Sequence, residues 1–175
     1  MNSFLAVLAT LLVATNAKYV ARVASLTDCG GTILTGTGAI FTDPILVPGE
    51  ASGQFDFVLS ADLPLDAIVE KRVFKIDTQE QVPCLGAGFL GSCTIRVCDA
   101  LASIPDIFCP FFPPNLPCEC PLLATSGSVP LTLNIPEAYI QFGPGDYEQV
   151  VRVYSEADPE TNLACADLKY TLINA

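Results

Sequence analysis

The eight cysteines constrain this chain more than any other feature of its sequence. All of them follow residue 17, and the chain has no histidine and no C-x-x-C spacing, which removes the usual partners of cysteine in zinc sites. An even number of cysteines behind a secretory leader predicts four disulfide bonds, so we expect no metal site and no cofactor. The cysteines are Cys29, Cys84, Cys93, Cys98, Cys109, Cys118, Cys120 and Cys165.

The segment 117–121, PCECP, places Cys118 and Cys120 one residue apart between prolines. Bridged cysteines prefer a Cα separation of about 5.5–6 Å and a defined dihedral angle, which such close neighbours do not reach without strain. Each of the two must therefore pair with a cysteine elsewhere in the chain. The spacing alone leaves the partners open.

Residues 1–17, MNSFLAVLATLLVATNA, predict a secretory signal peptide. The uncharged apolar run from 4 to 14 is about half of the roughly 20 residues that a spanning helix needs. Small residues follow it, and Ala17 suits a cleavage site. We therefore expect residues 18–175 to form a single domain in the secretory pathway, either lysosomal or extracellular.

The charge of the chain limits its partners. The formal net charge is −11 and the isoelectric point is near 4.1, whereas binding to nucleic acid needs clustered Lys and Arg, so nucleic acid is excluded as a partner. An anionic membrane should repel the chain at neutral pH. Carboxylates begin to protonate below about pH 5, so we expect contact with an anionic membrane surface at acidic pH. The chain is nevertheless 51% hydrophobic, which predicts apolar residues beyond the needs of a core.

Hydrophobic residues alternate at period two, which is typical of half-buried strands. In 53–60, Phe55, Phe57 and Leu59 share one face, and the final segment 163–175 repeats the pattern. We expect further strands in 31–41, 65–76, 130–136 and 146–155, turns at 43–53, 142–146 and 156–162, and one short helix at 98–104. The predicted fold is all-β: an antiparallel β-sandwich or β-cup with a cysteine- and proline-rich insertion from about 98 to 128.

Two apolar stretches stand out from this pattern. The motif GAGFLG at 86–91 lacks the βαβ context of a dinucleotide site, so we interpret it as a loop closed by disulfides. Its Phe89 and Leu90 either contact a ligand or membrane or pack against the protein. Phe108, Phe111 and Phe112 lie in a proline-rich segment that we expect to form neither a helix nor a central strand. They are either core residues or the rim of a hydrophobic opening.

No catalytic residue can be assigned, and we expect no enzyme activity. Without histidine there is no Ser–His or Cys–His pair, and disulfide-bonded cysteines are not thiolates. A carboxylate pair could hydrolyse a glycoside, but nothing selects one pair among 19 acidic residues. Glu156, Asp158 and Glu160 flank a proline between two predicted strands, which favours a solvated turn over a calcium or catalytic site.

The cysteine spacing carries a resemblance to a known family. The stretches VPCLGAGFLGSCT, VCDAL, FCP, LPCECP, NIPEAYIQFGPGDY and LACADLKYTL, within 27–175, resemble the ganglioside activators of lysosomes, which belong to the ML lipid-recognition group. The resemblance implies the pairs Cys29–Cys165, Cys84–Cys93, Cys98–Cys120 and Cys109–Cys118. It also implies a cup with a lipid cavity.

By the same resemblance, the chain would extract a membrane lipid, a sphingolipid or phospholipid, and present glycosphingolipids to a soluble glycosidase. The alternative is an extracellular carrier of a small hydrophobic ligand such as a sterol, fatty acid or odorant. The residues expected to line the cavity are Phe55, Phe57, Leu59, Val151 and Val153. Those expected to contact lipid or membrane are Phe89, Leu90, Phe108, Phe111, Phe112, Tyr139, Ile140 and Phe142.

Overall fold

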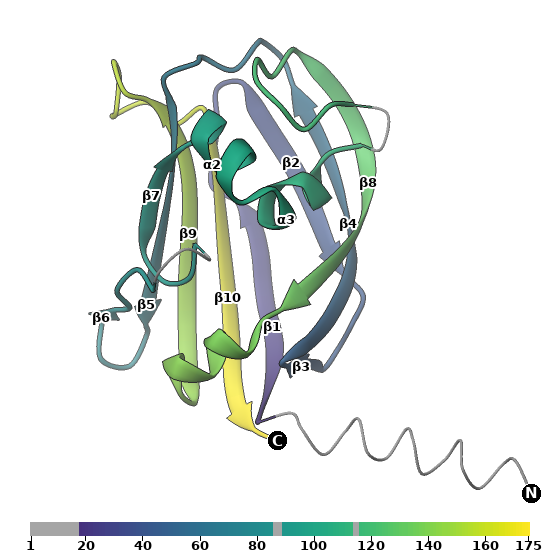
Figure 1. The fold of residues 1–175 in the computed structure, drawn as a ribbon. Helices are drawn as coiled ribbons and strands as arrows, with labels where there is room; N and C mark the ends of the chain where they lie inside the picture. The colour runs from purple at the N-terminus through teal and green to yellow at the C-terminus, as the bar shows by residue number, and fades with distance from the viewer. Residues whose placement is uncertain (1–17, 86–88, 114–115) are drawn as a thin grey trace, which may run out of the picture.

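Two antiparallel sheets face each other in this computed structural model, which describes residues 18–85, 89–113 and 116–175 (Figure 1). The predicted signal peptide lies outside the described residues, as does part of the GAGFLG loop. The larger sheet has the order β3-β1-β10-β9-β5-β6, with β7 also paired to β5, and the smaller sheet has the order β2-β4-β8. All pairs of these strands are antiparallel.

The strand bounds follow the alternation of the sequence. In β5, Ala67, Val69, Lys71 and Val73 are buried while the residues between them are half-buried or exposed. The larger sheet contains β1 (Tyr19–Asp28), β3 (Ile45–Val47), β5 (Ala67–Lys75), β6 (Glu80–Gln81), β7 (Cys93–Arg96), β9 (Gly145–Ser155) and β10 (Ala164–Asn174). The smaller sheet contains β2 (Leu34–Ile40), β4 (Gly49–Leu59) and β8 (Thr125–Ile135).

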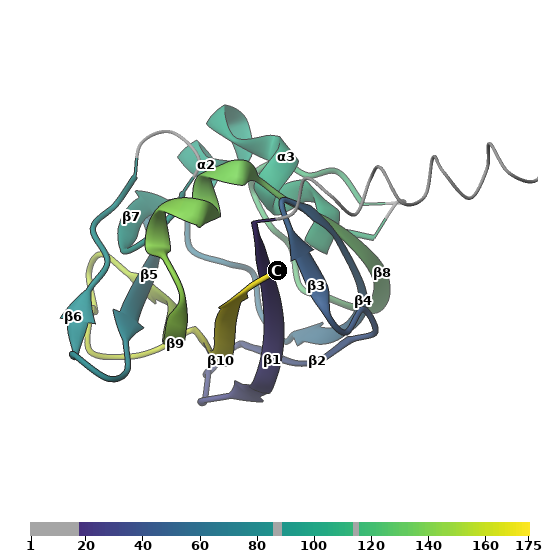
Figure 2. The ribbon, with the colours of Figure 1, turned by 90° about the horizontal axis from the view of Figure 1, so that it is seen from below.

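Short helices lie between the two sheets on the side away from β10 (Figure 2). Helix α2 (Val97–Ser103) contacts β5 and β7, and the 3-10 helix η2 (Cys109–Phe111) contacts β8. Helix α3 (Pro105–Phe108) joins them, and a second 3-10 helix, η3 (Glu137–Phe142), precedes β9. The predicted helix at 98–104 is confirmed, with both its start and its end one residue earlier.

Two predictions about local structure are wrong. The aromatic segment is helical as far as Phe111, because Pro105 and Pro110 occupy the first turns of α3 and η2, where a backbone N–H has no partner to lose. The predicted turn at 43–53 instead contains β3 and the start of β4. Strand β3 pairs with β1, itself missing from the predicted strands, and this long-range partner overrides the local turn residues.

The interior contains two clusters of buried side chains. We call the first the tyrosine core; it is built from the strands and comprises Ala21, Ile45, Val47, Ala51, Val73, Tyr147, Tyr170 and Leu172. We call the second the disulfide-side core; it lies beneath the helices and comprises Leu63, Ala67, Val69, Phe89, Cys93, Val97 and Leu101. Val69 and Val73 of the same strand therefore belong to different cores.

Four disulfides cross-link the chain, as predicted, and no cysteine is free. Cys118 pairs with Cys109 and Cys120 pairs with Cys98, at Cα separations of 5.5 and 5.7 Å. Cys84–Cys93 closes the loop before β7, and Cys29–Cys165 joins the ends of β1 and β10. The two neighbouring cysteines of PCECP thus tie one piece of chain to both ends of the α2–α3 segment.

Candidate functional site

A pocket of about 450 Å³ lies between the two sheets. It is lined by the facing sides of β1, β9 and β10 of the larger sheet and of β2 and β4 of the smaller sheet. Most of its wall is apolar, with Asp28, Thr27 and Thr37 as polar members. The remaining lining residues are Leu26, Leu34, Gly36, Gly38, Phe55, Val151, Val153, Ala164, Cys165 and Ala166.

Small residues on β2 leave room for the apolar wall. A Cβ atom on Gly36 would lie 2.7 Å from the ring of Phe55, and one on Gly38 would lie 2.6 Å from Cδ2 of Leu26. Larger residues at these two positions would therefore displace side chains that line the pocket. A smaller pocket of about 270 Å³ shares Leu26 and Gly38 with the first, so the space between β1 and β2 extends toward β3.

Three of the five residues predicted to line a cavity border this pocket. They are Phe55, Val151 and Val153. Phe57 stacks on Phe55 with ring centroids 5.9 Å apart, and Leu59 is buried; neither borders the pocket. Whether any of the five contacts a lipid stays a prediction.

The aromatic segment divides between a position beside the pocket residue Phe55 and the core. The ring of Phe111 meets Phe55 edge-on at 6.3 Å and remains 38% exposed. Phe108 packs on Phe89 at 5.4 Å, and Phe112 packs against the disulfide-side core. Of the two interpretations left open by the sequence, a rim position fits Phe111 and core packing fits the other two.

The remaining predicted contact residues lie in separate places. Phe89 and Leu90 are 8% and 7% exposed, so the packed interpretation fits these two residues. Tyr139, Ile140 and Phe142 are half-buried on η3 and pack against the tyrosine core. The structure thus does not bring the eight predicted contact residues to one surface.

Lys71 is the one buried charged side chain among the described residues, with 6% exposure. Its Nζ donates a hydrogen bond to the carbonyl of Phe89 and lies 4.9 Å from the centre of that ring. Burial lowers the pKa of Lys71 to about 8. The sequence contains a signal for this placement, because Lys71 is in phase with Val69 and Val73 in an alternating strand, yet a lysine in that pattern is easily taken for an exposed residue.

Tyrosines supply the other buried polar groups of the interior. Tyr147 has no exposed surface, and its hydroxyl donates to the carbonyl of Phe142. Tyr170 stacks on Tyr147 with ring centroids 5.5 Å apart, and its hydroxyl has no hydrogen-bond partner among the described residues. Burial raises the pKa of both hydroxyls, so both stay protonated and each has a proton to donate.

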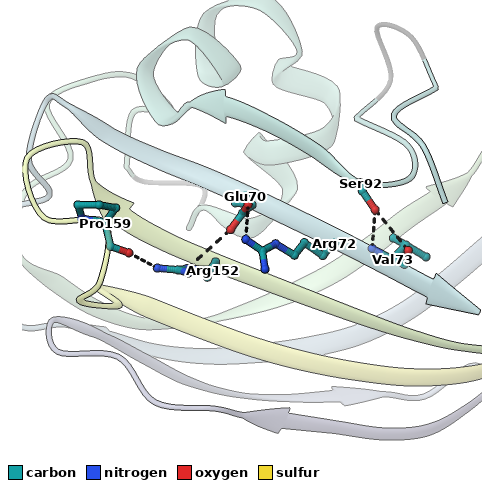
Figure 3. A network of polar contacts seen from close by, with 6 residues as sticks. All are labelled: Glu70, Arg72, Val73, Ser92, Arg152 and Pro159. Carbon is teal, nitrogen blue, oxygen red and sulfur yellow. Dashed lines mark hydrogen bonds and ion pairs between the residues drawn. The ribbon is translucent and has the colours of Figure 1, made fainter. Parts of the chain in front are cut away.

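The outer face of the larger sheet has the opposite character and carries a polar network (Figure 3). Glu70 accepts a hydrogen bond from Arg72 at 2.9 Å and lies 3.8 Å from Nε of Arg152. Arg152 also donates to the carbonyl of Pro159 in the turn before β10. In the same view Ser92 binds the backbone of Val73, which fixes the end of the Cys84–Cys93 loop to the strand that carries Lys71.

The acidic turn at 156–162 joins β9 to β10, as predicted. Glu156 forms an ion pair with Arg96 at 2.6 Å, and its carboxylate is about half exposed. Within the ranges that the structure describes, no group of three or more cysteine or acidic side chains could hold a metal ion. No helix in those ranges has both the length and the apolar character needed to cross a membrane.

Comparisons with known proteins give little further constraint. No family model matches the chain, and no curated protein matches it either. Among solved structures, chicken MD-1 complexed with lipid IVa is similar over 86% of this chain and 97% of that one, with 15% identity and a TM-score of 0.39. A likeness at this level does not establish a shared fold, so no property of MD-1 is assigned to this chain.

Proposed function

We propose that this protein binds lipids in the pocket between its two sheets and carries them between membranes. The observation that carries the proposal is the apolar pocket of about 450 Å³, which lies within the range of roughly 300–1,000 Å³ typical of small-molecule sites. An apolar ligand gains about 25 cal/mol for each Å² that it removes from water. No chemistry beyond binding is needed for this role.

Filling the pocket tests this proposal. Ala166 lines the pocket, and Ala166→Phe should reduce binding of a fluorescent lipid at least tenfold. Ala39 on β2 is exposed and does not border the pocket, so Ala39→Phe is the matched control and should bind as the wild type does. If native mass spectrometry finds no lipid on the wild-type protein after incubation with mixed vesicles, the proposal fails.

We further propose that the carrier extracts sphingolipids and presents them to a soluble glycosidase, with the ganglioside activators as the family that its cysteine spacing resembles. The net charge of −11 supports an acidic working pH, since protonation of Asp and Glu removes the repulsion from anionic lipids. Extraction from anionic vesicles should be weak at pH 7 and should rise steeply between about pH 5.5 and 4.

Vesicle co-sedimentation at two salt concentrations measures this dependence, because salt screens charges beyond about 8–10 Å and should relieve the repulsion at pH 7. Phe111→Asp should lower extraction at pH 4.5, because Phe111 is exposed beside the pocket residue Phe55. Equal binding to anionic vesicles at pH 7 and pH 4.5 would contradict the electrostatic gate. That result would favour the second candidate, an extracellular carrier of a small hydrophobic ligand.

The pocket volume favours this second candidate over a two-chain lipid. At about 450 Å³ the pocket lies near the lower end of the usual range for ligand sites, which suits one hydrocarbon chain better than two. Native mass spectrometry separates the candidates by the mass of the bound molecule. A two-chain lipid supports presentation to a hydrolase, and a single-chain ligand supports the small-ligand carrier.

A further inference from the structure

Lys71 lies on the inner face of the larger sheet, opposite the pocket residue Val151. In the strand register it is opposite Val151 of β9 on one side and Cys93 of β7 on the other. Val151 borders the pocket, and residues directly opposite in an antiparallel pair point to the same face. The ammonium group therefore belongs to the interior, at the boundary between the tyrosine core and the disulfide-side core.

The charge of Lys71 is incompletely compensated. An ammonium group has three N–H donors, and the structure gives it one hydrogen bond, to the carbonyl of Phe89. Phe89 itself adopts a left-handed backbone conformation with φ of 52°, which turns both its carbonyl and its ring toward Nζ. In the described part of the chain, none of the ion pairs involves Lys71. A buried cation without a counter-charge is costly, so this site favours an anion.

Further polar groups accompany Lys71 on the same face. Gln149 is two residues before Val151 and opposite Leu168, and Tyr170 is two residues beyond Leu168. A diagonal line across β5, β9 and β10 therefore contains Lys71, Gln149 and Tyr170. The Tyr170 hydroxyl is a buried donor without a partner among the described residues. This inner face therefore offers at least two kinds of unused donor to a polar head group.

We propose that the pocket takes a single-chain amphiphile with a carboxylate head, and that the carboxylate lies inward and binds the ammonium group of Lys71. The proposal rests on the proposed lipid-binding function and names its ligand class. The hydrocarbon chain fills the pocket along Val151, Val153 and Phe55, and the head passes Val151 to reach Lys71. A carboxylate carries one charge and matches one ammonium group, whereas a phosphate monoester carries about −1.5 to −2 and needs further cations.

Among the described residues, the charged groups on the elements packed around Lys71 form no ion pair with it. Asp28 lies in the same row three strands away, about 14 Å at the usual strand spacing, and its carboxylate is exposed and accepts hydrogen bonds from the N–H groups of Gly30 and Gly36. Glu70 and Arg72 alternate with Lys71 and face outward. Lys75 on β5 is half-buried, and Asp99 and Asp106 are exposed on the helices. Arg152 lies on the opposite, outer face with Glu70.

The experiment compares oleate with oleyl alcohol and oleoyl lysophosphatidate, using wild type, Lys71→Met and Lys71→Arg by titration calorimetry at pH 7. Wild type should bind oleate at least about tenfold more tightly than the alcohol. This ratio corresponds to the free energy that one charge-assisted hydrogen bond contributes. Lys71→Met should bind the two equally, with its affinity for the alcohol unchanged within about twofold. Lys71→Arg should keep the preference. Lys75→Met removes the same net charge from the same strand and should leave the preference intact.

A pH series on wild type decides the proposal even if Lys71→Met does not fold. The preference for oleate should hold from pH 6 to 7.5 and decline at higher pH as the ammonium group, whose pKa is about 8 without ligand, loses its proton. Equal affinity of wild type for oleate and the alcohol would overturn this inference and leave lipid binding standing. Binding of none of the three probes would overturn the proposed function itself. Lysophosphatidate binding tenfold more tightly than oleate would overturn the carboxylate assignment.

Discussion

The two halves of the interior are stabilised by different means. The tyrosine core is made by strands that pair along their length and by the stacked pair Tyr147 and Tyr170. The disulfide-side core is covered by short helices and loops, and three of the four disulfides lie between residues 84 and 120. Where segments cannot join a sheet ladder, cross-links replace the backbone hydrogen bonds that hold the other half together.

Lys71 marks the boundary between these halves. Val69 packs in the disulfide-side core and Val73 in the tyrosine core, and the residue between them on the same face is a lysine. An apolar residue at this position would join the two cores into one. The apolar packing along the inner face is therefore interrupted at Lys71, opposite the pocket residue Val151.

Truncation of the tyrosine core should have the largest effect on stability. Tyr147→Ala removes a fully buried ring, its stack with Tyr170 and the hydroxyl bond to Phe142. The free energy of unfolding should fall by about 4 kcal/mol. Urea denaturation measures this loss. The control is Tyr154→Ala on the outer face, where the centre of the ring lies 4.7 Å from Cζ of Arg152, and this change should cost only about 1 kcal/mol. Similar losses for both variants would contradict the assignment of the core.

Loss of a disulfide should have a smaller effect that is confined to the other half. Replacing both Cys98 and Cys120 by Ala opens a loop of 22 residues and should cost about 3 kcal/mol. The matched pair Cys109 and Cys118 closes a separation of only 9 residues and should cost less. Hydrogen exchange should then rise in α2 and α3 but not in β10. Increased exchange in β10 would show that the two halves unfold as one unit.

Removing the charge of Lys71 should have the smallest effect on the free energy of unfolding. It should stabilise the protein, whereas the two preceding changes destabilise it. The pKa of Lys71 is lowered to about 8 in the folded state from about 10.5 in the unfolded state, so below pH 8 both states carry the proton and the full cost of the buried charge is present. Between pH 8 and 10 the unfolded state binds more protons, and stability should rise by about 2 kcal/mol.

Thermal or urea unfolding of wild type and Lys71→Met across pH 7–10 measures this difference. The Met variant has a similar shape and no charge, so at pH 7 it should be as stable as wild type or more so. Subtracting its curve from that of wild type removes the contribution of all other groups. Parallel curves for the two proteins would show that Lys71 does not titrate in this range.

The elements that could be predicted from sequence are those that local pattern determines. Alternating residues in β4, β5, β8, β9 and β10 predict strands because half-buried strands require that period. The four disulfides follow from the count of cysteines, and their pairing from the resemblance in spacing. Strand β3 could not be predicted, because a three-residue strand depends on its partner β1.

The candidate site was less predictable for a related reason. The pocket is lined by residues as distant in sequence as Leu34 and Ala166. No local sequence pattern predicts that β2 lies over β10. Phe55, Val151 and Val153 could be predicted because they alternate on strand faces, but the same criterion includes Phe57 and Leu59, which do not border the pocket. Lys71 also obeys the alternation, but its burial could not be predicted from the sequence, because lysine is rarely buried.

The Cys29–Cys165 bridge also decides how the protein would respond to a pulling force. Both ends of the described chain lie together, since Ala175 donates a backbone hydrogen bond to Lys18, and β1 pairs with β10 from Tyr19↔Asn174 to Asp28↔Ala166. Tension applied at these ends would open that ladder one pair at a time, and full extension up to the bridge would also separate β1 from β3 and β10 from β9. Extension would then stop at about 80 Å, the length of the freed segments, with everything between Cys29 and Cys165 shielded from the load.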